Sequence, residues 1–126
     1  MNGKRIDDLR AALLTAHKAL IEDAKRAYIE AGNRQPTPVE FWHLLINDPA
    51  FQWLRRISET IVAIDEALDK GTMDEAKSFA LAKEELIDEA GPEFSDKLNQ
   101  AVTRDPRVRA AWESVVACLD NGEAKS

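Results

Sequence analysis

Residues 41–56 read FWHLLINDPAFQWLRR, and this stretch decides how the chain is divided into helices. It holds two of the four phenylalanines and two of the three tryptophans, and an Asn-Asp-Pro triplet interrupts it at residues 47–49. A proline disfavours helical geometry in the residue before it, while an aspartate in that place can cap a new helix. The stretch therefore predicts one short helix that ends near residue 46 and another that begins at Pro49.

The residues on either side of this stretch extend both predicted helices. Upstream, Thr37 and Glu40 have the spacing of a capping box, and Pro38 suits the first turn of a helix. Downstream, apolar residues recur at alternating steps of three and four, which is the spacing of a seam in a helix bundle. These seam residues are Leu54, Ile57, Ile61, Ile64 and Leu68.

The remaining segments also follow the helical period. The first helix is predicted over residues 4–31, with Gly32 as its left-handed stop. Thr72 and Glu75 have the spacing of a second capping box, which starts a helix over residues 75–90. The residues predicted to be buried in that helix are Ala76, Phe79, Ala82, Leu86 and Ile87.

Two further helices complete the predicted fold. A short one holds residues 94–102, and the last begins at Pro106 and closes at Asn121-Gly122, which leaves residues 122–126 as a frayed tail. No segment alternates with the period of two that a half-buried strand requires. We therefore predict an all-α protein with a single domain over residues 1–126. It is predicted to be an antiparallel bundle of four main helices with one or two additional short helices.

Composition and charge narrow the classes of function. Hydrophobic residues make up 44% of the chain and charged residues 32%, which is typical of a globular protein. The net charge of -6 and the pI near 4.9 argue against binding to nucleic acid or an anionic membrane, because phosphate recognition needs clustered Lys and Arg. No apolar run has the length of a signal peptide or a membrane span, so we expect a cytoplasmic protein. Acidic residues of the first helix, Asp23 among them, are interpreted as solvated surface.

The sequence has no clear constellation for catalysis or for binding a metal. Glu40 and His43 match the Glu-x-x-His spacing of di-iron bundles, but those sites need a second such motif and two further glutamates. The chain has only two histidines and one cysteine. Cys118 lies on an apolar stripe and is interpreted as a small buried side chain. We predict no catalytic residue, no metal ion and no cofactor.

One polar cluster is a candidate site for a small molecule. His17 falls one turn from the leucines of the first helix, so its ring is predicted to point inward. Three polar residues lie beside the apolar seam of the third helix, namely Arg55, Ser58 and Asp65. Together with Trp53 they would line a pocket between the two helices. The same side chains would equally suit a structural hydrogen-bond network, or the charged ones could be solvated at the edge of the seam.

The aromatic stretch permits two interpretations. The short helix of residues 38–46 is apolar nearly all round, so one of its faces needs a second neighbour. That neighbour is either the rest of the same bundle or another molecule. In the second interpretation Phe41, Trp42 and Phe51 contribute to an exposed patch that binds another subunit or a ligand.

The central segment, residues 45–69, resembles a family of small bacterial helical proteins of unknown function. The family has an Asp-Pro-x-Phe-x-Trp-Leu-Arg segment followed by Ser and an Ile-Asp-Glu run. The matching residues here are Asp48, Pro49, Phe51, Trp53, Leu54, Arg55, Ser58, Ile64, Asp65 and Glu66. A looser similarity covers residues 16–33 and 104–108, and Arg56 stands where the family often has a proline. The resemblance implies a bacterial source and one helical domain, and it transfers no activity.

Two hypotheses for the function follow. The first is a non-enzymatic protein that acts by association, as a homodimer or with a protein partner, through residues 41–53. The alternative is a small-molecule-binding domain with a pocket between the first and third helices. An enzyme is the least supported class, because no base, nucleophile and oxyanion donor are recognisable together.

Overall fold

The computed structural model describes residues 2–71 and 74–124, and within them the chain is all-α, as predicted. It forms six α-helices, one 3₁₀-helical segment (η1) and one π-helical turn (η2), and the described residues contain no strand. The elements are α1 (Asn2–Glu30), α2 (Pro38–Asn47), η1 (Pro49–Leu54), α3 (Arg55–Lys70), α4 (Glu75–Lys83), η2 (Glu84–Asp88), α5 (Gly91–Arg104) and α6 (Pro106–Ala124).

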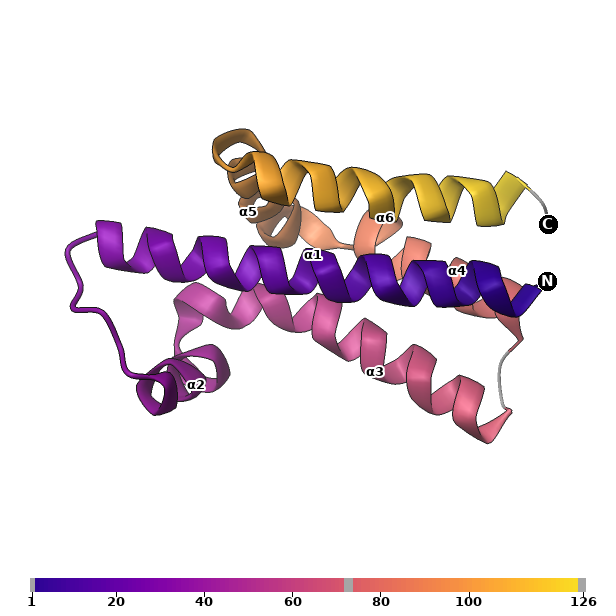
Figure 1. Ribbon diagram of the computed structural model, residues 1–126, viewed down its shortest axis with the longest axis horizontal. Coiled ribbons are helices and arrows are strands. Elements are labelled where there is room, and N and C mark those ends of the chain that lie inside the picture. Colours follow the sequence, from indigo (N-terminus) through magenta and orange to yellow (C-terminus); the bar gives the residue numbers. More distant parts are fainter. Residues whose placement is uncertain (1, 72–73, 125–126) are drawn as a thin grey trace.

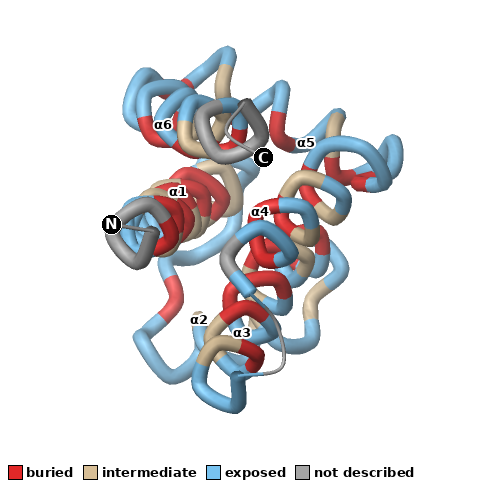
Figure 2. The backbone as a smooth tube through the Cα atoms, turned by 90° about the vertical axis from the view of Figure 1, so that its right-hand side faces the viewer, coloured by how far each residue is buried: buried red, intermediate tan, exposed pale blue. Residues whose placement is uncertain are grey.

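Helix α1, with 29 residues, is the longest helix that the structure describes. It runs side by side with α6 and antiparallel to it, so the two chain ends lie at the same end of the molecule (Figure 1). It also contacts α3, α4, α5 and η1. Seen along α1, the buried stretches of these helices turn towards a common interior, while the exposed stretches face outward (Figure 2). Helix α2 lies near the end opposite the chain ends and packs mainly on η1. The finer prediction of four main antiparallel helices is not confirmed by this arrangement.

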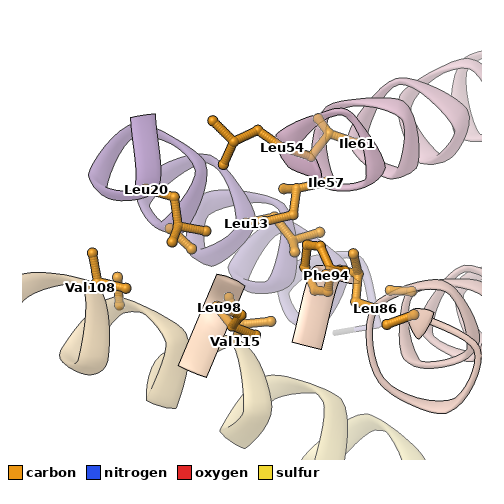
Figure 3. Close-up of a cluster of buried hydrophobic side chains, with 14 of the residues drawn as sticks. Leu13, Leu20, Leu54, Ile57, Ile61, Leu86, Phe94, Leu98, Val108 and Val115 are labelled. Carbon is orange, nitrogen blue, oxygen red and sulfur yellow. The ribbon is translucent and has the colours of Figure 1, made fainter. Parts of the chain in front are cut away.

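One cluster of apolar side chains forms the core. From α1, Leu13 and Leu20 reach into it with 0% and 1% of their surface exposed. Removing the side chain of such a leucine typically costs about 2–5 kcal/mol of stability. Figure 3 shows these leucines facing side chains from η1, α3, η2, α5 and α6, which are Leu54, Ile57, Ile61, Leu86, Phe94, Leu98, Val108 and Val115. None of the helices in the described residues has the length and apolar character needed to cross a membrane.

The helix predicted to begin at Pro49 starts as a 3₁₀ segment and becomes α-helical only at Arg55. The carboxylate of Asp48 accepts a hydrogen bond from the N–H of Ala50 at 2.8 Å, as expected for a cap. In a 3₁₀ segment, side chains three residues apart eclipse each other. Phe51 and Leu54 are therefore on the same side, and both are buried.

The helix predicted over residues 75–90 is interrupted by the π-helical turn η2. Asp74 caps α4 by accepting from the N–H of Lys77 at 2.8 Å, while the predicted cap Thr72 lies outside the described residues. The prediction that Ala76 and Ile87 are buried is wrong, because both are exposed. The extra residue in a π turn rotates the chain that follows it, which carries Ile87 outward.

The end of the last helix also differs from the prediction. Helix α6 continues to Ala124, so the predicted stop at Asn121-Gly122 is wrong; of the predicted frayed tail, residues 125 and 126 lie outside the described range. On α1, Leu14 follows the buried Leu13, yet 55% of its own surface is exposed. Gly32 does have the left-handed conformation predicted for it, with φ at 102°.

Candidate functional site

A groove of about 240 Å³ lies between α1, α2, η1 and α3. Its lining combines six apolar side chains with three polar ones. The apolar residues are Ile21, Trp42, Leu45, Ile46, Phe51 and Leu54, and the polar residues are His17, Arg55 and Ser58. The three polar residues all belong to the set predicted from the sequence for a pocket between the first and third helices.

Helical spacing and antiparallel packing explain why these polar residues meet. Helices α1 and α3 run in opposite directions (Figure 1). Arg10 of α1 and Asp65 of α3 are joined by an ion pair at 2.7 Å, which shows the register of the two helices. His17 lies seven residues after Arg10, and Ser58 lies seven residues before Asp65. Seven residues are close to two helical turns, so His17 and Ser58 come opposite each other.

The polar side chains of the groove differ in charge and in whether they already have a hydrogen-bond partner. His17 is half-buried, and burial lowers the pKa of its imidazole below the usual value, so the ring is neutral at neutral pH. The hydroxyl of Ser58 donates to the carbonyl of Arg55 at 3.0 Å, and its oxygen can still accept a hydrogen bond. The Arg55 side chain is exposed and makes no ion pair or hydrogen bond within residues 2–71 and 74–124.

The other two residues predicted for this pocket lie elsewhere. Asp65 forms the ion pair with Arg10 that is described above. Trp53 is buried, with 7% of its surface exposed, and packs against Phe94 of α5 at a ring-centroid distance of 5.9 Å. Because η1 turns Trp53 away from the groove, the predicted five-residue cluster is divided, and the groove gathers three of its members.

Helix α2 forms one wall of the groove and also has an outer face. Thr37 and Glu40 make the predicted capping box, with hydrogen bonds of 3.2 Å and 2.8 Å between each side chain and the other residue's N–H. Six of the ten residues of α2 are Val, Phe, Trp, Leu or Ile, yet none of the ten is fully buried. Val39, Trp42 and Ile46 leave 67%, 60% and 37% of their surface exposed. Positions 39, 42 and 46 share one side of a helix, so the exposed apolar surface is continuous along α2.

The three predicted interface aromatics have different environments. Phe51 is 1% exposed and belongs to the core, so it is not available to a partner. Phe41 is half-buried and packs edge-on against Phe51 at 5.5 Å, with the ammonium of Lys25 above its ring at 5.1 Å. Trp42 alone of the three has most of its surface exposed. The outer face of α2, defined by Val39, Trp42 and Ile46, therefore replaces the predicted aromatic patch.

A larger cleft of about 620 Å³ lies on another flank of α3, between it and the segment η2–α5. Trp53 and Phe94 form part of its lining, together with the carboxylates of Glu59, Glu85 and Glu93 and the guanidinium groups of Arg55 and Arg56. In it, Arg56 donates to the backbone carbonyl of Glu85 at 3.0 Å and pairs with its carboxylate at 3.1 Å. The cleft therefore presents both signs of charge, and part of that charge is already neutralised.

The sequence interpretation missed a network of charges that joins α1 to the α5–α6 junction. Asp23 was interpreted as solvated surface, but it is only 1% exposed. One of its carboxylate oxygens accepts two hydrogen bonds from the guanidinium group of Arg104, at 3.0 Å and 2.6 Å. Beside it, Arg26 donates to Asp105 at 3.0 Å. The sequence did contain a signal, because Asp23 lies three residues after Leu20 on the buried stripe of α1.

Asp105 has two roles in this network. Its carboxylate also accepts from the N–H of Arg107 at 2.9 Å and so caps α6. Burial by itself would raise the pKa of Asp105, but the hydrogen bonds from Arg26 and Arg107 outweigh it and the pKa is lowered. The network thus fixes the end of the α1–α6 pair that lies away from the chain ends.

No group of three His, Cys, Asp or Glu side chains within the described residues could hold a metal ion. Cys118 is half-buried, and burial, with a smaller contribution from Asp8, raises the pKa of its thiol. A raised pKa keeps the sulfur protonated and therefore a weak nucleophile at neutral pH.

Comparison of the chain with protein-family models, curated proteins and solved structures gave no match. The resemblance of residues 45–69 to a bacterial family therefore stays a prediction.

Proposed function

We propose that this protein acts by association rather than catalysis, and that a second copy of the chain binds to the outer face of α2. The observation that carries the proposal is the environment of α2. An apolar helix usually buries its apolar surface, but α2 packs mainly on η1, leaves most of Val39 and Trp42 exposed and leaves Ile46 37% exposed.

Charge favours a second copy as the partner. In a two-fold symmetric dimer the same patch meets itself, so an apolar face is complementary to its own copy. The whole chain has a net charge of -6, which opposes self-association in general. On α2, however, the single carboxylate, Glu40, is paired with Arg34 at 2.9 Å. The outer face of α2 therefore brings no unpaired acidic group against its copy.

The size of the patch sets the expected strength. A ten-residue helix covers a footprint of roughly 15 Å by 10 Å. A stable interface buries about 800 Å² per partner. A dimer formed through α2 alone is therefore expected to be weak and to depend on concentration.

The test is analytical ultracentrifugation between about 1 µM and about 1 mM, the range of weak dissociation constants. We expect the mass to rise from that of the 14.1 kDa chain towards twice that value. Trp42→Ala is expected to weaken the dimer by about 2 kcal/mol or more, since a central tryptophan is the usual hot spot. Val39→Asp is expected to abolish it, because a charge would be buried without a partner.

Two comparisons make this test specific. Val39 lies in the first turn of α2, where an aspartate suits the helix dipole, so Val39→Asp is expected to stay folded. The matched control is Val62→Asp, which places the same charge at a 53% exposed valine of α3. A mass that never exceeds one chain, or a mass that Val39→Asp and Val62→Asp lower equally, would contradict association through α2.

A further inference from the structure

We propose that the groove between α1, α2 and α3 is a binding site for a small organic monoanion with an apolar tail, whose acidic group is held at Arg55. The groove shares Trp42 and Ile46 with the outer face of α2, whereas Val39 belongs to that face alone. The proposal rests on the amphipathic lining of the groove, the free cation within it and the charges of the neighbouring cleft.

The lining of the groove matches a ligand that has two chemically different ends. Leu45, Phe51 and Leu54 offer aliphatic and aromatic surface to a tail, whereas His17, Arg55 and Ser58 bring the polar groups. Ligand sites commonly combine mainly apolar walls with a few polar groups that fix the orientation. The volume of about 240 Å³ lies just below the range of about 300–1,000 Å³ for drug-sized ligands, so the ligand is expected to be small.

Arg55 gives the site its preference for an anion. Some arginines of the described residues already have carboxylate partners, including Arg10 with Asp65, Arg56 with Glu85 and Arg104 with Asp23. Arg55, which borders the groove, makes no such pair in the part of the chain that the structure describes. A guanidinium group binds a carboxylate through two parallel hydrogen bonds, so it is well suited to an acidic head group.

The neighbours of Arg55 support one negative charge rather than two. The imidazole of His17 is neutral at neutral pH because burial lowers its pKa, so it offers a hydrogen bond without a second positive charge. The hydroxyl proton of Ser58 is directed to the backbone carbonyl of Arg55. A monoanion therefore suits the groove better than a phosphate group with two charges.

The larger cleft is the competing location, because Arg55 borders it as well. Three carboxylates, Glu59, Glu85 and Glu93, also line that cleft and would repel an anion. No carboxylate lines the groove. Electrostatics therefore place the acidic head on the His17 side of Arg55 and the tail along α2 and η1.

The test uses three probes that share an eight-carbon tail, namely octanoate, 1-octanol and octylammonium, each below the concentration at which it self-associates. Binding is followed by chemical shifts of the ¹⁵N-labelled protein. We expect octanoate to shift the amides of His17, Leu45 and Leu54. The octanol should bind at least roughly ten-fold more weakly, since it lacks the charge-assisted hydrogen bonds, and octylammonium should not bind.

Variants separate the two ends of the ligand. Arg55→Gln should weaken octanoate at least roughly ten-fold and leave octanol unchanged, because only the anion uses the guanidinium group. Arg107→Gln is the matched control, since Arg107 is an exposed arginine that lies outside the groove lining. Leu45→Trp, which fills the groove, should weaken both probes. Val39→Asp should leave octanoate binding intact even if it abolishes dimerisation, because Val39 does not line the groove.

Three results would overturn the proposal. The first is equal binding of octanoate and octanol, and the second is octanoate affinity that Arg55→Gln does not change. The third is octanoate-induced shifts at Glu59, Ala63 and Leu81, which would place the ligand in the larger cleft. Absence of binding by all three probes would also reject the site, without bearing on the association through α2.

Discussion

At the scale of single residues, the ion pair formed by Asp23 and Arg104 joins two side chains of very different exposure. The carboxylate is 1% exposed, whereas the guanidinium side chain keeps 44% of its surface in solvent. Loss of Arg104 would leave the buried carboxylate with only the longer contact to Arg26 at 3.8 Å, which is costly, while loss of the aspartate would leave a cation that water can solvate. Replacement of Arg104, the more exposed partner, is therefore expected to cost more stability than replacement of Asp23.

We predict that Arg104→Gln lowers the free energy of unfolding by about 3 kcal/mol, because Asp23 loses its bidentate partner. The matched control is Arg10→Gln, which breaks the pair with Asp65, where both side chains are about equally exposed at 40% and 44%. That change is expected to cost less than about 1 kcal/mol. Urea unfolding followed by circular dichroism measures both values. Equal losses would show that burial of Asp23 does not govern the pair.

Predictions of burial for single residues were correct where the helical period determines burial, and wrong where burial depends on a partner that is distant in the chain. Leu9, Leu13 and Leu20 are buried as their spacing indicates. Asp23 shares their face of α1, but its burial depends on Arg104, which is 81 residues away in the chain. No local pattern indicates such a partner. The helical period therefore indicated that Asp23 is buried, whereas its charge indicated that it is exposed.

At the scale of elements, helix starts followed from local chemistry, whereas irregular turns did not. Thr37, Asp48 and Asp105 act as caps through hydrogen bonds within three residues of themselves, and a sequence displays such contacts directly. The 3₁₀ segment η1 and the π turn η2 are set by tertiary packing instead. That is why the sequence placed Trp53 in the groove, while η1 directs it to α5.

We predict that α2 opens independently of the rest of the protein. Thr37→Ala removes one half of its capping box and is expected to destabilise the helix by about 1 kcal/mol. Amide hydrogen exchange should then become roughly five-fold faster within α2, while protection within α1 and α6 stays constant, because α2 has no fully buried residue.

A threonine elsewhere provides the control for this measurement. Thr103 is exposed on α5, and its hydroxyl donates to the carbonyl of Asn99 at 2.7 Å. Thr103→Ala should not alter exchange within α2. If Thr37→Ala lowered protection equally in α1, α2 and α6, then α2 would unfold only together with the whole molecule.

At the scale of the whole molecule, His17 and Asp105 connect stability to pH in different windows. The pKa of His17 is lowered by burial, so the unfolded chain binds its proton more readily, and stability is lost as pH falls below about 6.5. The pKa of Asp105 is lowered by its hydrogen bonds, so its contribution is present above about pH 4 and is lost as pH falls further. Acid therefore weakens the fold in two steps.

We predict that each step can be removed separately. His17→Leu should make the free energy of unfolding less dependent on pH between about 7 and 5, and Asp105→Asn should do so below about pH 4. Urea unfolding of each variant and the parent protein at matched pH values gives the difference, in which contributions from other groups cancel. A variant whose profile stays parallel to that of the parent would rule out the assigned group.

The antiparallel pairing of α1 and α6 has a mechanical consequence. Because the chain ends lie together at one end of this pair (Figure 1), a force that pulls them apart acts across the helix contact rather than along it. Such a force separates the two helices one turn at a time, so only the side-chain contacts of one turn oppose it at any moment. The Asp23–Arg104 and Arg26–Asp105 pairs lie at the far end and would be reached last. The force needed to extend the chain is therefore expected to be low at first and to rise when the separation of the helices reaches these ion pairs.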